Sequence, residues 1–191
     1  MKTIRDSTAA EYALWYLKRE RKKQEREKRP TTPVPTDPTT ALTLMQYCHD
    51  GKWRPWYPSA KWSIVSLENV NDFRSLVFLD NDWTKAELLT VDDGENYRLL
   101  DHVAKRAIDV GYLSRSSAEG HRAYYAQIQG GFRLVGDERI VIRSLEDERA
   151  RNPSGRYYLQ DGAGRGLSYM ILLTQARLTY EPVESFLAEK R

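Results

Sequence analysis

A proline-rich segment divides the chain and limits how its first 40 residues can fold. Four of the eight prolines stand close together, at Pro30, Pro33, Pro35 and Pro38, with threonines at most positions between them. Proline lacks a backbone N–H and fixes φ, so such a run favours an extended, semi-rigid linker. The sequence therefore predicts three parts, which are an N-terminal basic helix within residues 1–29, a linker over residues 30–40 and a folded domain over residues 41–191.

The segment before the prolines has the pattern of one long helix. Thr8 and Glu11 have the spacing of a capping box, and the helix is expected over residues 8–28. Its first half is apolar and includes Trp15 and Tyr16, whereas its second half carries charges of both signs at helical spacing. Two arrangements stay open: an appendage on the linker, or a helix that folds back onto the domain through Trp15 and Tyr16.

Positive charge is concentrated in this helix, although the whole chain of 191 residues has 30 Lys and Arg against 27 Asp and Glu. Residues 18–29 carry a local charge of +5, so the remaining residues share −2 of the total of +3. Such a run is typical either of a solvated helix or of an arm that binds nucleic acid or a protein partner. The candidate DNA-binding residues are Lys18, Arg19, Arg21, Lys22 and Lys23.

Aromatic residues gather after the linker and are interleaved with basic ones. They are Tyr47, Trp53, Trp56, Tyr57 and Trp62, with Lys52, Arg54 and Lys61 among them. Such rings either stack on the bases of a single strand or pack at the edge of the core.

The rest of the chain alternates strand-like and helix-like segments, which predicts an α/β (α+β) fold with a mixed sheet and packed helices. Strands are expected at residues 62–66, 75–79, 139–145 and 156–160, helices at residues 95–111 and 167–175, and a last strand or short helix within residues 178–186. No apolar run is long enough for a membrane span, and the single cysteine, Cys48, excludes a disulfide framework within the chain. A cytoplasmic protein is expected.

A glycine-rich segment follows the strand predicted at residues 156–160. Gly162, Gly164 and Gly166 surround Arg165, and a helix is predicted to follow. Glycines and a helix start can aim backbone N–H groups at an anion, and an exposed Arg165 would add a planar donor for phosphate. The spacing is neither that of a Walker A loop nor that of a Rossmann fingerprint. A purely structural connection is the alternative.

Acidic residues near this segment are candidates for holding Mg²⁺ or positioning water. Asp161 adjoins the glycines, and Asp93 and Glu95 stand at the start of the helix predicted over residues 95–111. Magnesium is held by one or two carboxylates together with substrate phosphates, and Asp161 is the candidate metal ligand. Ordinary roles in turns and helix caps are the alternative for all three residues.

The strand, the tyrosines before the turn and the run Gly162-Ala163-Gly164-Arg165 resemble the ParB/sulfiredoxin superfamily, whose Gly-x-x-Arg element binds nucleotide phosphates. The resemblance covers roughly residues 62–186 and implies nucleotide binding by Gly162, Gly164 and Arg165, with ATP and Mg²⁺ as cofactors. Ala163 stands where sulfiredoxins carry a reactive cysteine, so sulfinic-acid reduction is not expected. The paired arginines and the helix-turn-helix domain of chromosome-partition members are not evident either.

In length and organisation the chain is similar to stand-alone members of the superfamily, in particular Osa-type plasmid fertility-inhibition proteins. This resemblance implies a DNase and ATPase that acts on transferred plasmid or T-DNA and inhibits conjugative transfer. The expected partners are DNA and a type IV secretion or coupling component. Two alternatives stay open: a non-enzymatic inhibitor that binds a secretion or transfer component, and a small-molecule kinase of the same superfamily.

Overall fold

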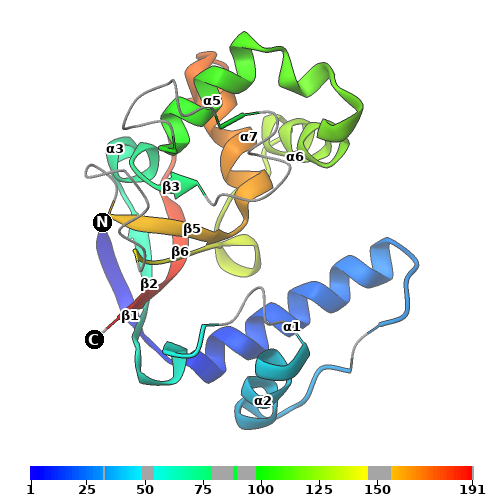
Figure 1. Ribbon diagram of the computed structural model, residues 1–191, viewed down its shortest axis with the longest axis vertical. Coiled ribbons are helices and arrows are strands. Elements are labelled where there is room, and N and C mark those ends of the chain that lie inside the picture. Colours follow the sequence, from blue (N-terminus) through cyan, green and yellow to red (C-terminus); the bar gives the residue numbers. More distant parts are fainter. Residues whose placement is uncertain (32, 49–53, 79–87, 90–97, 146–155, 191) are drawn as a thin grey trace.

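The computed structural model describes residues 1–31, 33–48, 54–78, 88–89, 98–145 and 156–190. Within these residues, six strands form one mixed sheet in the order β1-β2-β6-β4-β5-β3, and helices pack against it, so the fold is α/β as predicted (Figure 1). The strands are β1 (Lys2–Ser7), β2 (Lys61–Leu67), β3 (Val77–Phe78), β4 (Ile140–Ser144), β5 (Tyr157–Asp161) and β6 (Val183–Glu189). The α-helices are α1 (Ala9–Arg26), α2 (Pro38–Cys48), α3 (Val70–Arg74), α5 (Leu100–Asp109), α6 (Glu119–Gln129) and α7 (Ala163–Thr174). The short 3-10 turns are η2 (Tyr57–Ser59), η4 (Tyr112–Ser114), η5 (Ser116–Ala118) and η6 (Gly136–Glu138).

The sheet joins strands that lie far apart in the sequence. β2 pairs antiparallel with β1 on one side and with β6 on the other. β6 in turn runs parallel to β4, which is antiparallel to β5, and β5 is parallel to β3. The last strand of the sequence therefore lies inside the sheet and connects its two halves.

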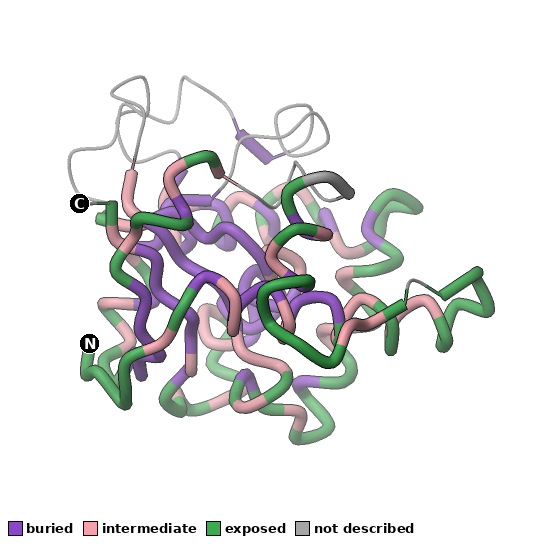
Figure 2. The backbone as a smooth tube through the Cα atoms, turned by 90° about the horizontal axis from the view of Figure 1, so that it is seen from below, coloured by how far each residue is buried: buried purple, intermediate pink, exposed green. Residues whose placement is uncertain are grey.

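Both faces of the sheet are covered, because its side chains belong to two separate clusters of buried residues. Buried residues accordingly gather at the centre of the molecule (purple in Figure 2). In β4, Ile140 and Ile142 face the core beneath α5 and α7, whereas Val141 faces the core beneath α1. This alternation confirms the predicted strand and follows from its two-residue side-chain period. Helices α5, α6 and α7 thus cover one face of the sheet, and α1 with α2 covers the other (Figure 1).

The N-terminal helix folds back onto the domain. Thr8 caps α1 by accepting a hydrogen bond from the backbone N–H of Glu11 at 3.1 Å, as the capping-box spacing predicts. Tyr12 and Tyr16 are buried, and the Tyr12 ring stacks on Trp62 of β2 at 4.8 Å between centroids. The preceding residues add strand β1, for which the sequence shows no pattern. Of the two arrangements left open, the structure therefore shows the packed one.

The extended linker is shorter than expected. Helix α2 begins at Pro38, and the Asp37 side chain accepts hydrogen bonds from the backbone N–H groups of Thr39 and Thr40 at 2.9 and 3.1 Å. Proline is tolerated in the first turn of a helix because the N–H it lacks would have no partner there. Residues 38–40, which were assigned to the linker, therefore belong to a helix that packs against α1.

The aromatic cluster mostly serves packing. Tyr57 and Trp62 are buried against each other with ring centroids 5.0 Å apart, and Trp62 Nε1 donates to the Tyr57 carbonyl at 2.9 Å. Trp56 is half-buried beside them. Residues 52 and 53 lie outside the described residues. For the described pair, packing rather than base stacking is the role observed.

Several predicted boundaries shift. The helix predicted over residues 95–111 is described from Leu100 to Asp109, and Gly111 follows it in the left-handed conformation with φ +61°. The tail forms strand β6 rather than a helix, and α6 was not predicted. None of the helices among the described residues has the length and apolar character that crossing a membrane requires.

Candidate functional site

The site begins at the sharp turn between β5 and α7. Gly162 stands immediately before α7 with φ +83°, a conformation that favours glycine. A Cβ atom there would lie 2.8 Å from Ile140 Cγ2 and 3.0 Å from Arg165 Nη2. Both the backbone conformation and the surrounding side chains therefore require glycine at this position.

The other two glycines lie inside the first turn of α7, which begins at residue 163 and not at 167. A Cβ on Gly164 would lie 3.3 Å from the Tyr124 ring of α6, and one on Gly166 would lie 2.9 Å from Leu159 Cδ2 of β5. The glycines thus let α7 approach both neighbours closely. The purely structural interpretation accounts for these two positions without a ligand.

Arg165 is buried, and the expectation of an exposed loop residue is wrong. It is 2% exposed because helix α7 has already begun at this position and turns the side chain inward. Its Nη1 donates to the carbonyl oxygen and to Oε2 of Glu138, at 2.8 and 2.9 Å. Burial, together with the positive charge of Arg19, lowers the pKa of Arg165 despite the nearby carboxylates of Asp161 and Glu138.

Asp161 lies between two arginines that come from different helices. Arg19 Nη1 of α1 is 2.5 Å from Asp161 Oδ2, and Arg165 Nη2 is 3.7 Å from the same oxygen. The Arg19 guanidinium also lies over the Trp15 ring, 5.1 Å from its centroid. Burial acts to lower the pKa of Arg19, but the charge and the hydrogen bond of Asp161, together with Tyr124 and Tyr16, outweigh burial, so that this pKa is raised. Asp161, which is 6% exposed, thus forms ion pairs with one arginine of α1 and one of α7.

A small cavity of ≈ 50 Å³ opens beside this ion network, and we call it the basic cavity. Its described lining residues are Arg19, Lys22, Lys23, Arg26, Tyr124, Gln127, Phe132, Glu138 and Arg165. Five of these side chains are cationic and one is a carboxylate. Lys22 pairs with Asp137 at 2.8 Å, whereas Lys23 and Arg26 form no ion pair with any described residue. The cavity therefore carries an excess of positive charge.

The structure brings together residues that the sequence assigned to two different ligands. Arg19, Lys22 and Lys23, the candidate DNA-binding residues, line the same cavity as Arg165, the candidate nucleotide-binding residue. Lys18 and Arg21 line a neighbouring groove of ≈ 360 Å³. That groove is bounded by Trp15, Arg19, Lys22, Glu25, Val34 and Asp137 as well. Positive charge thus continues along α1 from the groove to the cavity.

The two predicted glycines are not lining residues of the basic cavity, but they lie close to residues that are. A Cβ atom on Gly162 would approach Arg165, and one on Gly164 would approach Tyr124. Asp93 and Glu95 lie outside the described residues.

Asp161 does not fit the role of a magnesium ligand. Its Oδ2 already contacts the Arg19 guanidinium, and a second guanidinium lies nearby, so a divalent cation would meet two positive charges at this position. The carboxylate of Glu138 is engaged by Arg165. Across the part of the chain that the structure describes, no group of three or more His, Cys, Asp or Glu residues could hold a metal ion.

Sequence reasoning missed Tyr124, Gln127 and Glu138. The first two belong to α6, whose sequence did not suggest a helix, so nothing pointed to their position. Glu138 follows Gly136 and Asp137 directly before strand β4, and this acidic turn was the available signal. The position of the turn beside α1 and α7 could not be read from it.

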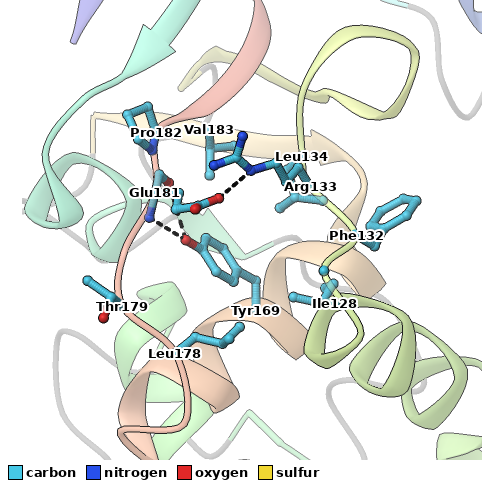
Figure 3. Close-up of a pocket in the computed structure, with 11 residues that line it drawn as sticks. Ile128, Phe132, Arg133, Leu134, Tyr169, Leu178, Thr179, Glu181, Pro182 and Val183 are labelled. Atoms are coloured by element: carbon cyan, nitrogen blue, oxygen red, sulfur yellow. Dashed lines mark hydrogen bonds and ion pairs between the residues drawn. The ribbon is translucent and has the colours of Figure 1, made fainter.

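A separate hollow, of ≈ 240 Å³, lies between the end of α6 and the segment before β6 (Figure 3). Arg133 Nε donates to Glu181 Oε2 at 2.5 Å, and the Tyr169 hydroxyl accepts from the Glu181 backbone N–H at 2.7 Å (Figure 3). Apolar side chains such as Phe132 and Leu134 form much of the remaining lining. The charges here are paired with each other, and none of the predicted site residues contributes.

Comparison of the chain with protein-family models, with curated proteins and with solved structures gave no match. The resemblance to the ParB/sulfiredoxin superfamily therefore stays a prediction.

Proposed function

We propose that the basic cavity binds the phosphate groups of nucleotides and DNA, in a nucleotide-hydrolysing DNA nuclease of the ParB/sulfiredoxin-like type that inhibits conjugative transfer. The observation that carries this proposal is the burial of Arg165 together with its incomplete hydrogen bonding. Arg165 lines the cavity and its side chain is 3% exposed, yet its Nη2 makes no hydrogen bond to any described residue, with the Asp161 carboxylate 3.7 Å away. Buried polar groups normally have hydrogen-bond partners, so this atom supports an acceptor that enters the cavity.

A phosphate group matches the surroundings of Arg165. A guanidinium offers two parallel donors to phosphate oxygens, and Lys23 and Arg26 add charge without partners among the described residues. The cavity also lies beside the N-terminal end of α7, whose dipole favours negative charge. On DNA, Lys18 and Arg21 would extend the contact along α1 to neighbouring phosphates.

In this proposal the cationic side chains stabilise charge on the phosphate as a bond to it breaks. Asp161 positions Arg19 and Arg165 and does not bind metal, in keeping with its contacts. ATP is the proposed nucleotide and Mg²⁺ the proposed ion, which would neutralise charge on the phosphates. Asp93 and Glu95 remain the proposed carboxylates for this chemistry. Action on plasmid DNA would take place in the cytoplasm.

Replacing the two cations that have no described partner tests the binding proposal. Lys23→Gln/Arg26→Gln should weaken ATP and DNA affinity about tenfold, because charge-assisted contacts to phosphate are lost, and should leave the melting temperature unchanged. Lys105→Gln/Lys190→Gln is the matched control, since it removes the same charge from positions outside the cavity lining. Equal losses in both double variants would mean that only net charge matters, which would contradict a site at the cavity.

The enzymatic part needs its own measurement. Purified wild-type protein with Mg²⁺ should nick plasmid DNA and release phosphate from ATP. If neither reaction occurs while ATP still binds, the non-enzymatic inhibitor of a secretion or coupling component replaces the nuclease. The poor fit of Asp161 to a metal favours this alternative. Transfer of the ATP γ-phosphate to a small molecule would instead indicate the kinase.

A further inference from the structure

We propose that the carboxylate of Glu138 occupies the place of a ligand phosphate and competes with it for Arg165. The proposal rests on the proposed function and concerns the regulation of the same cavity. Glu138 gives Arg165 Nη1 two acceptors, its backbone carbonyl at 2.8 Å and its side-chain Oε2 at 2.9 Å. An anion that approaches Arg165 through the cavity therefore meets a negative group that is already bound there.

The two partners differ in their freedom to move. The Arg165 side chain is 3% exposed, whereas that of Glu138 is 39% exposed and lines the cavity. Arg165 is also enclosed by Gly162, where any Cβ would lie 3.0 Å from Nη2. An entering phosphate would therefore displace the Glu138 side chain, which can turn toward solvent while the Arg165 guanidinium stays in place.

The backbone of the turn is anchored independently of this side chain. Glu184 of β6 accepts a hydrogen bond from the Gly136 backbone N–H and one from Arg139 Nη2, both at 3.0 Å. These contacts flank Glu138 on either side in the sequence. When the carboxylate leaves, the Glu138 carbonyl can therefore keep its hydrogen bond to Arg165 and hold the donor in orientation.

A phosphate can displace this carboxylate because it reaches groups that Glu138 does not contact. Lys23 and Arg26 line the cavity and form no ion pair with any described residue. A phosphate carries more charge and more acceptor oxygens than a single carboxylate, so it can bind these cations and Arg165 together. A ligand with a single carboxylate would take the place of the Glu138 carboxylate at Arg165 but would not gain these additional contacts. The competition therefore favours phosphate ligands and excludes simple carboxylates.

Glu181 provides a matched control away from the basic cavity. Its carboxylate lies 2.5 Å from Arg133 Nε, its side chain is 51% exposed, and it is not among the residues that line the cavity. Glu181→Gln and Glu138→Gln each replace an ion-paired glutamate by glutamine, but Glu138 contacts Arg165 whereas Glu181 contacts Arg133.

The test is calorimetric titration of the full-length chain with pyrophosphate, ATP and acetate. Glu138→Gln should bind pyrophosphate and ATP about tenfold more tightly than wild type, because the competing charge-assisted contact is lost, while acetate should bind neither protein. Glu181→Gln should stay within about twofold of wild type, since its exposed ion pair with Arg133 lies outside the cavity lining. Glu138→Asp, which keeps the charge but shortens the side chain, should also bind more tightly and guards against misfolding of the first variant.

The outcomes separate this proposal from the one on which it rests. If wild type binds both ligands and neither Glu138 variant binds them more tightly, the competition is excluded and the phosphate site stands. The same conclusion follows if Glu181→Gln gains as much as Glu138→Gln. If wild type and variants all fail to bind pyrophosphate and ATP, both proposals are wrong.

Discussion

At the scale of single residues, Asp161 contributes most to the arrangement of the site. It is the shared counter-charge of Arg19 and Arg165, and all three side chains are largely buried. Removing one partner of a buried ion pair is strongly destabilising because the charge left behind is neither hydrated nor compensated. Asp161 therefore contributes to the stability of the fold as well as to the geometry of the site.

We therefore predict that Asp161→Asn lowers the free energy of unfolding by about 3–5 kcal/mol, because two buried guanidinium groups lose their common partner. Urea denaturation measures the change. Asp137→Asn, which breaks only an exposed pair with Lys22, should lower it by less than about 1 kcal/mol. A loss below about 1 kcal/mol for Asp161→Asn as well would contradict the role of Asp161 as a buried counter-charge.

His121 predicts a pH dependence of stability. Burial lowers the pKa of His121, whose Nδ1 lies 3.2 Å from the Tyr112 hydroxyl oxygen. Below its usual pKa of about 6.5, the unfolded chain takes up a proton more readily than the folded one, so acidification costs stability. Above that value both states are neutral and the contribution is complete. It is lost as the pH falls toward the lowered pKa of the folded state.

Unfolding of wild type between pH 7.5 and 5.5 should thus show a fall in stability that is smaller in His121→Gln, by at most about 1.4 kcal/mol per pH unit. Comparing the two proteins by urea denaturation removes the shared effect of the carboxylates. Parallel pH curves would show that His121 binds its proton equally well in both states.

At the scale of elements, close packing against neighbouring elements limits which residues α7 can carry. Gly166 faces β5 without room for a methyl group, whereas a Cβ on Gly120 of α6 would meet no atom within 4 Å. We predict that Gly166→Ala destabilises the protein by about 1–3 kcal/mol through overpacking. Gly120→Ala should be neutral or stabilise it by up to about 1 kcal/mol, because alanine loses less backbone freedom in a helix. Thermal denaturation of both variants provides the comparison.

The opposite order of stabilities would mean that helix propensity dominates over packing at α7. Equal destabilisation by both substitutions would show that the first turn of α6 is also closely packed.

Part of the fold could be predicted because local patterns determine it. The alternation of Ile140, Val141 and Ile142 reflects a strand with two buried faces, and the spacing of Thr8 and Glu11 marks a helix start. Strand β1 was missed because most of its side chains are exposed, so it lacks an apolar alternation. The start of α7 was missed because glycine disfavours helices in isolation, whereas tertiary contacts favour it here.

The candidate site was predictable residue by residue but not as an assembly. Arg165 and the basic residues of α1 were identified from their type and their neighbours in the sequence. That Arg19 meets Asp161 depends on α1 folding across the sheet, a contact between residues more than 100 positions apart. No local pattern encodes such a contact, nor does any reveal that Glu138 would approach Arg165.

At the scale of the whole molecule, the N-terminal residues are part of the fold and not an appendage. β1 pairs with β2, and α1 covers Trp62, Ile64 and Phe186 on one face of the sheet. We predict that deleting residues 1–40 abolishes cooperative melting, because this face would be exposed to water. Near-ultraviolet circular dichroism during heating measures it. A truncated chain that still melts sharply would show that the sheet and the helices α5–α7 fold without α1.

The place of β6 within the sheet has a consequence for the order of events during synthesis. β1 and β2 leave the ribosome early, and β4 and β5 follow much later, yet among the described strands it is β6 that joins the two pairs. Until the residues of β6 have been translated, each pair exposes an unpaired edge and the apolar residues beneath it. Pairing between β2 and β6 closes a loop of more than 100 residues, so completion of the sheet is a late and comparatively slow step. Nascent chains stalled before β6 would therefore depend on chaperones to avoid aggregation.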